Sequence, residues 1–203
     1  MTKISKPFSE LLGFLCAEGH HKISYSSYWG KERGKPRFYR NHKSECIEFF
    51  SKDKNLLKHY QKIIYEIFGY NPNITKDNKI HICRRKPISI ITKYTEIGHL
   101  KWKVPDLILK SKQEIKIAFL KGYFEGDGTA SNRIRMFSTN KSGLNQVSLI
   151  LDDLKIKHTW QGPILKENRK PSYILQISQK SRERFLNLLK PISKRPDICE
   201  GNQ

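Results

Sequence analysis

The sequence predicts an α+β fold made of two similar halves, and two observations support this prediction. The segment Leu11–Gly19 reads LLGFLCAEG and the segment Leu120–Gly128 reads LKGYFEGDG, so one pattern of apolar, small and acidic positions ending in glycine occurs twice. Each segment is followed by a similar succession of strand-like and helix-like stretches. We therefore expect the order αββαββα in each half.

In the first half, two alternating stretches follow the first motif, at 20–28 and 37–50. They predict a β-hairpin whose tip, 30–36, is basic and contains glycine. A helix is expected next, because Asp53 is a suitable N-cap and Gly69 a suitable stop. The apolar residues at helical spacing between them are Leu56, Leu57, Tyr60, Ile63, Ile64 and Ile67.

A second hairpin is expected over 71–84, with Asp77 and Asn78 at its turn, and then a helix within 87–97. Residues 99–112 contain Pro105 and show little periodicity, so we expect a linker there. The predicted domains are an N-terminal half, 1–98, the linker, 99–112, and a C-terminal half, 113–203.

The second half repeats the order in shorter form. After the second motif we expect a tight hairpin over 129–138 and a helix over 140–154 with a regular apolar face. Strands are expected at 157–165 and 172–178, and a last helix at 181–189.

The composition indicates the class of partner. The chain has 203 residues and a formal net charge of +20, with a pI near 9.9, which favours a polyanionic partner such as nucleic acid. No stretch reaches membrane-spanning length, and the N-terminal apolar run is too short for a signal peptide. We expect an intracellular, monomeric protein without a membrane partner.

The cysteines do not indicate a metal or disulfide framework. No C-x-x-C pair is present, so we expect reduced, partly buried side chains without a zinc site. These residues are Cys16, Cys46, Cys83 and Cys199.

The small residues of the two motifs predict a helix–helix interface. Gly13 and Ala17 in the first motif, and Gly122 and Gly126 in the second, are each four positions apart, so each pair lies on one helical face. Small side chains on facing surfaces allow two backbones to pack closely. We therefore expect the two motif helices to pack against each other.

Such packing would bring together Glu18 and Asp127, one acid at the end of each motif. Gly19 and Gly128 follow and are expected to end the helices in the left-handed conformation. Two acids near helix C-termini repel each other and the helix dipoles, and a divalent cation with oxygen ligands offsets both effects. The alternative is that both are solvent-exposed acids at ordinary glycine caps, but the duplication favours a functional site.

LLGFLCAEG and LKGYFEGDG resemble the paired motifs of LAGLIDADG homing endonucleases, and the region from Trp102 to Ile117 resembles the segment between the motifs of that family. The resemblance implies two pseudo-symmetric halves whose antiparallel sheets form a DNA-binding saddle, with the motif helices at the interface. It also implies metal-dependent cleavage of both strands of a long, non-palindromic DNA site. Glu18 and Asp127 would bind Mg²⁺ beside Gly19 and Gly128, with Mn²⁺ or Ca²⁺ able to substitute in binding.

The resemblance extends to supporting residues. It implies a polar residue after the second strand of each half, here Asp53 and Asn140, and a lysine after each last helix, here Lys103 and Lys194. Asp53 and Asn140 are equally suited to be plain helix N-caps. Cys16 and Glu125 share the sixth motif position, and a cysteine there indicates that Glu125 is structural or lies at the rim rather than binding metal. Glu18 also departs from the commoner aspartate.

The basic hairpin and the other strand ends supply candidate DNA contacts, in which Lys and Arg bind phosphates and alternating polar side chains read bases. The candidates are Lys22, Ser24, Arg33, Arg37, Tyr39, Asn41, Lys43, Arg84, Arg85, Arg133 and Arg135. Because the halves differ in sequence, an asymmetric target is expected.

The sequence allows three alternatives to a free-standing endonuclease. An intein is the least favoured of them, because the chain starts with Met1 and has no room for a splicing domain. An RNA maturase that binds intron RNA would use the same basic surface. A DNA-binding regulator without cleavage activity is expected to have lost one motif acid, and both are present.

Overall fold

The computed structural model describes residues 4–193. The first half forms α1 (Lys6–Glu18), β1 (His20–Glu32), β2 (Lys35–Phe50), α2 (Lys54–Phe68), β3 (Lys79–Ile82) and α3 (Arg85–Thr92). A short helix, α4 (Asp106–Leu109), precedes the second half. That half forms α5 (Gln113–Asp127), β4 (Gly128–Ala130), β5 (Ile134–Ser138), α6 (Lys141–Asp153), β6 (His158–Ile164), β7 (Ser172–Ile177), a 3₁₀ turn (Gln179–Ser181) and α7 (Arg182–Leu189).

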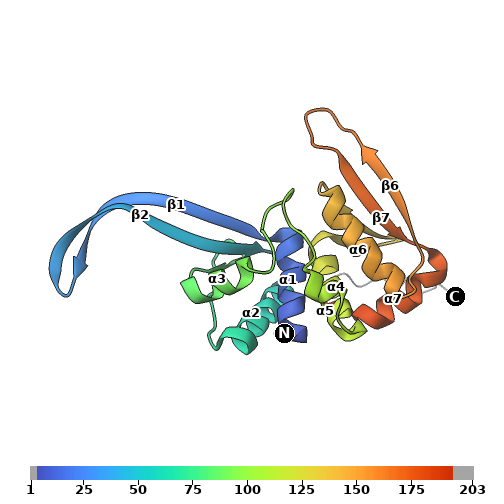
Figure 1. Cartoon of the computed structure of the whole chain (residues 1–203), viewed down its shortest axis with the longest axis horizontal. Helices are drawn as coiled ribbons and strands as arrows, with labels where there is room; N and C mark the ends of the chain where they lie inside the picture. The colour runs from blue at the N-terminus through green and yellow to red at the C-terminus, as the bar shows by residue number, and fades with distance from the viewer. Residues whose placement is uncertain (1–3, 194–203) are drawn as a thin grey trace.

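The described strands form two antiparallel sheets, in the orders β1-β2-β3 and β4-β5-β7-β6. The two hairpins β1–β2 and β6–β7 project from a body of helices in different directions (Figure 1). The α+β prediction is confirmed, and the second half has the predicted order αββαββα. Among the described residues, no helix is long and apolar enough to cross a bilayer.

The predicted second hairpin of the first half is only partly formed. Its first arm is reduced to an isolated bridge between Ile74 and Ile80, while its second arm is β3. Pro72 supplies no backbone donor to a ladder, and its carbonyl instead accepts a hydrogen bond of 2.7 Å from the Gln61 side chain of α2. The helix expected within 87–97 begins earlier, at Arg85, and ends at Thr92.

The long β1–β2 hairpin extends beyond the predicted strand ends. Its turn consists of Arg33 and Gly34, whose φ angles are 49° and 82°. Two positive φ values match the right-handed twist of the flanking strands, so pairing continues up to Glu32 and Lys35. The register shifts between Ser26 and Tyr28, where a bulge changes the twist of the ribbon.

The predicted helix after this hairpin is confirmed with both of its ends. The Asp53 side chain accepts hydrogen bonds from the backbone N–H groups of Asn55 and Leu56, and Gly69 ends the helix at φ 69°. The apolar face is buried except for Ile67, which is partly buried. Local signals at both ends were therefore sufficient to predict α2.

The segment predicted as a linker is packed into the core. Trp102, Val104 and Ile108 are each at most 1% exposed. A side chain at Gly143 would lie 2.5 Å from the Trp102 ring, so the glycine lets α6 approach this segment closely. The domain boundaries at 98 and 112 remain a prediction.

Two cysteines that lie far apart in the sequence meet in the fold. Cys46 on β2 and Cys83 after β3 are neighbours, because β2 pairs with β3 in antiparallel register. All three described cysteines are free, as expected; Cys46 is partly buried and Cys16 buried, whereas Cys83 is exposed. Cys199 lies outside the described residues.

Helices α1 and α5 lie side by side at the centre of the molecule (Figure 1). A Cβ added at Gly13 would overlap the carbonyl oxygen of Phe119, and one added at Gly122 would overlap that of Glu10. The 109-residue offset between the motifs relates Gly13 to Gly122 and Glu10 to Phe119. The contact is therefore pseudo-twofold, and the predicted close packing of the motif helices is present.

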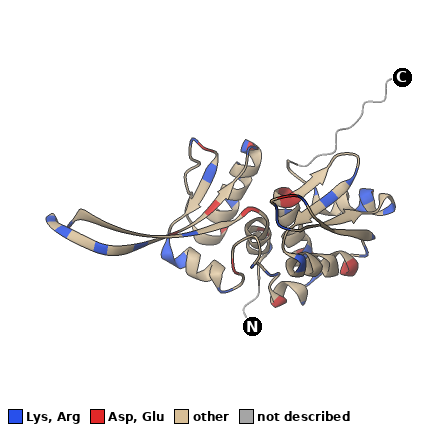
Figure 2. Ribbon diagram, turned by 90° about the horizontal axis from the view of Figure 1, so that it is seen from above, with Lys and Arg blue, Asp and Glu red and all other residues tan. Residues whose placement is uncertain are grey.

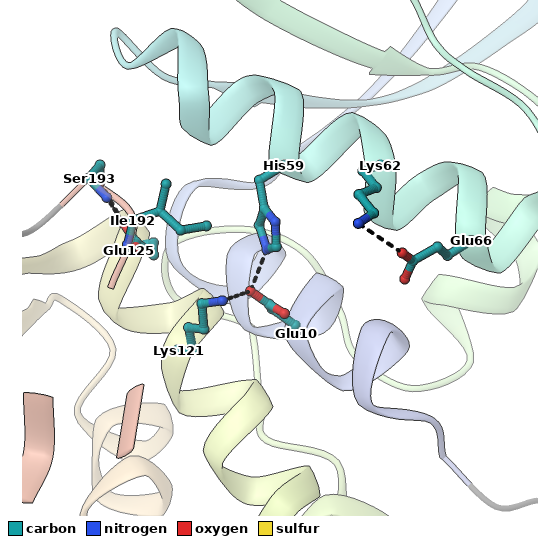
Figure 3. A network of polar contacts seen from close by, with 8 residues as sticks. All are labelled: Glu10, His59, Lys62, Glu66, Lys121, Glu125, Ile192 and Ser193. Carbon is teal, nitrogen blue, oxygen red and sulfur yellow. Dashed lines mark hydrogen bonds and ion pairs between the residues drawn. The ribbon is translucent and has the colours of Figure 1, made fainter. Parts of the chain in front are cut away.

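A polar network at the edge of this interface connects three helices (Figure 3). The Glu10 carboxylate of α1 lies 2.7 Å from His59 Nε2 of α2 and 3.3 Å from Lys121 Nζ of α5. The Glu10 side chain is only 12% exposed, so its negative charge is held where two donors compensate it. The network ties both halves together beside the glycine contact.

We predict that Gly13→Ala and Gly122→Ala each lower the free energy of unfolding by about 3 kcal/mol, because the added methyl group forces the helices apart. Urea unfolding monitored by circular dichroism measures this. Asn145→Ala, at an exposed site on α6, is the control and should be nearly neutral. A neutral result for either glycine variant would contradict the packing argument.

Candidate active site and nucleic-acid interface

The two motif acids end the paired helices. Glu18 is the last residue of α1 and Asp127 the last of α5; Glu18 is exposed and Asp127 half-buried. A Cβ at Gly126 would overlap Ala17 and lie 3.1 Å from Glu18 Cγ, so α5 reaches the end of α1 at its own last turn. The helix contact therefore brings both acids to the same end of one seam.

The glycines that follow the acids do not adopt the expected left-handed conformation. Gly19 has φ −70° and ψ 137°, and Gly128 has φ −98° and ψ 162°, so both are extended. A Cβ at Gly19 would overlap the Leu15 carbonyl oxygen, and one at Gly128 would overlap Phe124. The prediction was wrong, because the glycines permit a sharp helix-to-strand junction against the preceding turn rather than a positive φ.

Glu18 lines a hollow of about 350 Å³. Gly126 of the opposite motif helix also lines this hollow. The segment between β2 and α2 lines it as well, with Ser51, Lys52 and Asp53. Glu125 and Ser193 of the other half also line this hollow, so Glu18 lies beside residues of both halves.

Asp127 lines a second hollow, of about 250 Å³, with an equivalent construction. Ala17 comes from the opposite motif helix, and Ser138 and Thr139 come from the segment between β5 and α6. His99 also lines this hollow. Each acid therefore has its own hollow, bounded by the same parts of the fold.

Asp53 and Asn140 are both helix N-caps. The Asn140 side chain accepts a hydrogen bond of 3.0 Å from Gly143 N and donates one of 2.7 Å to the Trp102 carbonyl. In both halves a serine two positions earlier, Ser51 or Ser138, accepts from the backbone N–H of the cap residue. Capping accounts for both residues; a further role in the active-site water network remains a prediction, with Asp53 better placed because it lines the Glu18 hollow.

Lys103 lies beside a third hollow. Its side chain is exposed and lines this hollow with Asp106 and Gln146 rather than either hollow that contains a motif acid, and its role at the active site remains a prediction. Its backbone is held by Thr95, whose Oγ1 donates to the Lys103 carbonyl at 2.9 Å. Lys194 lies outside the described residues.

Sequence reasoning missed Lys52 and His99, each of which lines a hollow with a motif acid. Lys52 stands between the second strand and the cap residue Asp53, and this position was the available signal. His99 Nε2 lies 2.6 Å from Lys170 Nζ, which joins the linker to the end of the β6–β7 hairpin.

The sixth motif position fastens the segment after the last helix in each half. The Glu125 carboxylate is 2% exposed and accepts hydrogen bonds from Ser193 and from the backbone of Ile192 (Figure 3). Cys16 Sγ lies 3.8 Å from Thr95 Oγ1. Burial raises the pKa of Cys16 to about 12, although the Thr95 hydrogen bond opposes the shift. These hydrogen bonds give Glu125 a structural role, and the expectation that it binds no metal remains a prediction.

Tyr123 lies beneath the Asp127 hollow. Burial raises the pKa of its hydroxyl well above the ordinary value, and the charge of Asp127 raises it further. The hydroxyl donates a hydrogen bond of 2.9 Å to the Phe137 carbonyl, and Trp102 packs on the ring at 5.2 Å. Tyr123 therefore remains neutral and supports the strand that borders the hollow.

Aromatic and basic side chains share one face of the projecting hairpin. The rings of Tyr28 and Tyr39 stack with centroids 5.2 Å apart, and His42 meets Tyr28 edge-on at 5.7 Å. Arg37 lies 5.4 Å above Tyr39 and forms an ion pair with Glu32. Lysine and arginine residues occur along the whole hairpin (Figure 2).

The other predicted hairpin contacts divide between the two faces. Lys22 and Ser24 alternate with the inward-facing positions and lie on the face of His42. Lys43 lies on the opposite face, 3.0 Å from Glu45. Asn41 is at the bulge with φ 49°, and its N–H donates to Ser27 Oγ. Arg33 is in the turn.

Arg84 and Arg85 lie where β3 gives way to α3. The Arg84 guanidinium lies 4.0 Å from the centroid of the Tyr70 ring, a cation–π contact. Arg85 lines a surface hollow of about 600 Å³ beside Ser44 of β2. The strand pairing thus brings Arg85 close to the hairpin.

On the second sheet, Arg133 is in the turn between β4 and β5, and Arg135 Nε donates to Gln176 Oε1 at 3.0 Å. Gln161 lies 3.4 Å from the same oxygen. Neither glutamine was predicted, although β-strand alternation places both on the face of Arg135. Glutamine and arginine are side chains that read base edges.

Residues 114–190 match the LAGLIDADG-like domain family. The homing endonuclease I-DmoI, in a structure of its mesophilic variants, has a TM-score of 0.65 and 22% identity, with 93% of this chain and 92% of that chain covered. I-DmoI in complex with DNA and Ca has a TM-score of 0.65 and 23% identity, with 93% and 91% covered. The chain is thus a protein of the LAGLIDADG fold, and it carries a LAGLIDADG-like domain in its second half.

Two curated relatives are named DNA polymerase. That of Methanocaldococcus jannaschii is 26% identical over 195 residues, which are 92% of this chain and 11% of that protein. That of Thermococcus litoralis is 26% identical over 158 residues, 76% of this chain and 8% of that protein. The chain spans about a tenth of the length of these relatives.

The paired caps allow a structural role to be separated from a charged one. We predict that Asp53→Ala lowers the free energy of unfolding by about 1 kcal/mol, because the first turn of α2 loses its acceptor, whereas Asp53→Asn keeps the cap and is nearly neutral. Thermal and urea unfolding of the two variants measure this. Equal losses in both would show that the charge of Asp53, rather than its cap, stabilises the helix.

Proposed function

We propose that this chain is a site-specific endonuclease that makes double-strand breaks in a long, non-palindromic DNA site by metal-dependent phosphodiester hydrolysis. One observation carries the proposal. Glu18 and Asp127 end two helices held in contact by pseudo-twofold glycine packing, and each acid lines its own hollow. Two equivalent hollows beside one seam suit a reaction performed once on each strand.

The chemistry of the donors fits a hard divalent cation. Glu18 and Asp127 supply carboxylate oxygens, and Mg²⁺ uses one or two carboxylates while it keeps water and phosphate oxygens as its other ligands. A bound ion would activate water and neutralise the scissile phosphate. I-DmoI has been crystallised with its target DNA and Mn²⁺ and with DNA and Ca²⁺, which supports a divalent ion here.

The residues of the chain that surround the acids have distinct tasks. Lys52 is exposed beside Glu18, so its ammonium group can hold a phosphate oxygen or polarise a nearby water molecule. The helix contact holds the carboxylates in fixed positions, which removes the need to order them when DNA binds. Gly19 and Gly128 would leave room for the backbone of DNA at the end of the seam.

The hairpins supply the binding surface. The β1–β2 ribbon extends far beyond the helices and carries lysine and arginine residues along its length (Figures 1 and 2). It also carries the stacked rings of Tyr28 and Tyr39. A two-stranded ribbon fits the major groove. The second sheet offers Arg135, Gln161 and Gln176 on one face. Because the two ribbons differ in length and side chains, each would read its own half-site, and the target would be asymmetric.

The experiment incubates the purified protein with a randomised plasmid library in Mg²⁺ and sequences the linearised products. We expect specific double-strand breaks in the wild type, and at least a 10²-fold lower rate in Glu18→Gln and in Asp127→Asn, since several kcal/mol of charge stabilisation are lost. Both variants should still bind the recovered site. Glu183→Gln, an exposed acid on α7, is the matched control and should cleave normally.

Specific binding without cleavage by the wild type would instead favour a DNA-binding regulator. Cleavage at full rate by both acid variants would sink the proposed active site, whatever the binding behaviour.

A second prediction concerns the hairpin. Arg33→Ala at the ribbon tip should weaken binding to the recovered site and reduce the slope of log K against log salt by about one, because one phosphate contact is lost. Fluorescence anisotropy at several salt concentrations measures the slope. Lys62→Ala on α2, where the lysine pairs with Glu66, is the control and should leave the slope unchanged.

A further inference from the structure

A second group of potential metal ligands lies on the first sheet, on strands β2 and β3. Glu48 and His81 are direct cross-strand partners, and continuing the register by one residue beyond the pair Ile47 and Ile82 places Cys46 opposite Cys83. Residues two apart on a strand point to the same face, so all four side chains share one face of the sheet. Antiparallel pairing thus gathers two thiols, an imidazole and a carboxylate into a two-by-two grid.

The ligand atoms are close together. The thiol of Cys46, a carboxylate oxygen of Glu48 and a ring nitrogen of His81 all lie within 4.8 Å of one another. Cys83 is a neighbour of Cys46 and supplies a second thiol beside this group. The described part of the chain contains one such group of three or more histidine, cysteine or acidic side chains that meets this distance criterion.

One polar atom of the group is left unsatisfied. His81 Nε2 is buried and makes no hydrogen bond, and Glu48 Oε1 lies 3.9 Å from it. A buried ring nitrogen without a partner costs free energy, and such an atom calls for an explanation. A metal ion between His81 and Glu48 would supply the missing partner.

Glu48 supplies the negative charge of the group. One of its carboxylate oxygens lies 3.8 Å from Lys79 Nζ and the other 3.9 Å from His81 Nε2. A divalent ion beside the second oxygen would bind the carboxylate and the imidazole together.

We propose that Cys46, Glu48, His81 and Cys83 bind a zinc-like, borderline-soft divalent ion, at a site separate from that of the two motif acids. Sulfur and nitrogen ligands select zinc over magnesium, which prefers oxygen. Tetrahedral zinc with bonds of about 2.0 to 2.3 Å places its ligand atoms within roughly 4 Å of one another, so the side chains need to move by only about 1 Å.

The ion would stabilise the edge of the first sheet. Strand β3 has four residues, Lys79–Ile82, and lies at the edge of the sheet, where short strands are held weakly. Coordination from both strands would fasten β3 to β2 and fix the start of α3, which begins two residues after Cys83. This role is structural and does not depend on DNA cleavage.

The test is a cobalt titration of the full-length protein, treated first with a chelator and kept reduced with a phosphine. We expect one equivalent of Co²⁺ to give a thiolate-to-cobalt charge-transfer band and the visible bands of tetrahedral cobalt, and Zn²⁺ to abolish both. Cobalt bound to motif carboxylates would give neither band. Cys83→Ser should lose about half of the charge-transfer intensity, and the double variant Cys46→Ser, Cys83→Ser all of it.

The matched control is Glu45→Gln. Glu45 forms a similar histidine–carboxylate pair with His21 at 2.8 Å, on the opposite face of the same strands. This variant should keep both cobalt bands. Absence of a thiolate band in the folded wild type, or its persistence in the double cysteine variant, would overturn the proposal.

The melting temperature of the protein gives a second test that does not depend on the cobalt absorption bands. Zn²⁺ at about 100 times its Kd should raise the Tm of the wild type by about 5 °C or more, and Mg²⁺ at the same concentration should not. His81→Ala, whose folding is checked by circular dichroism, should lose the zinc-dependent rise. An equal rise in that variant would contradict a site that includes His81.

Discussion

The contact between α1 and α5 is the constraint on which the rest of the structure depends. Gly13 and Gly122 let the two backbones touch, and the contact repeats itself about a pseudo-twofold axis. Because the helices are fixed along their length, their ends are fixed as well. Glu18 and Asp127 thus reach one edge of the seam without any loop to position them.

Each half adds the same supporting structure to its motif helix. The strand that follows leads to a serine and a capped helix, and these border the hollow beside the acid. The sixth motif position fastens the end of the half, with Cys16 in the first half and Glu125 in the second. Different chemistry at these two positions performs one structural task, which explains why the sixth position tolerates both residues.

Local signals predicted much of the fold. Asp53 and Gly69 defined α2, and the small residues Gly13 and Gly122 predicted the helix contact, because caps and close packing depend on a few residue types at fixed spacing. Features that depend on distant parts of the chain were missed. Lys103 was predicted from the family pattern of a lysine after the last helix, and the sequence did not indicate that Thr95 holds its backbone. The cysteine, histidine and glutamate group emerges only when β2 pairs with β3, and a C-x-E segment opposite an H-x-C segment was its only trace.

Glu18 and Asp127 are the residues proposed to hold the metal ions of a nuclease, one beside each hollow. Crystals of the protein with its recovered DNA site and Mn²⁺, measured at the manganese absorption edge, test this proposal. We expect anomalous density at the seam, within coordination distance of each carboxylate and next to the scissile phosphates. Manganese density only at other positions, with the two acids unliganded, would contradict the proposal.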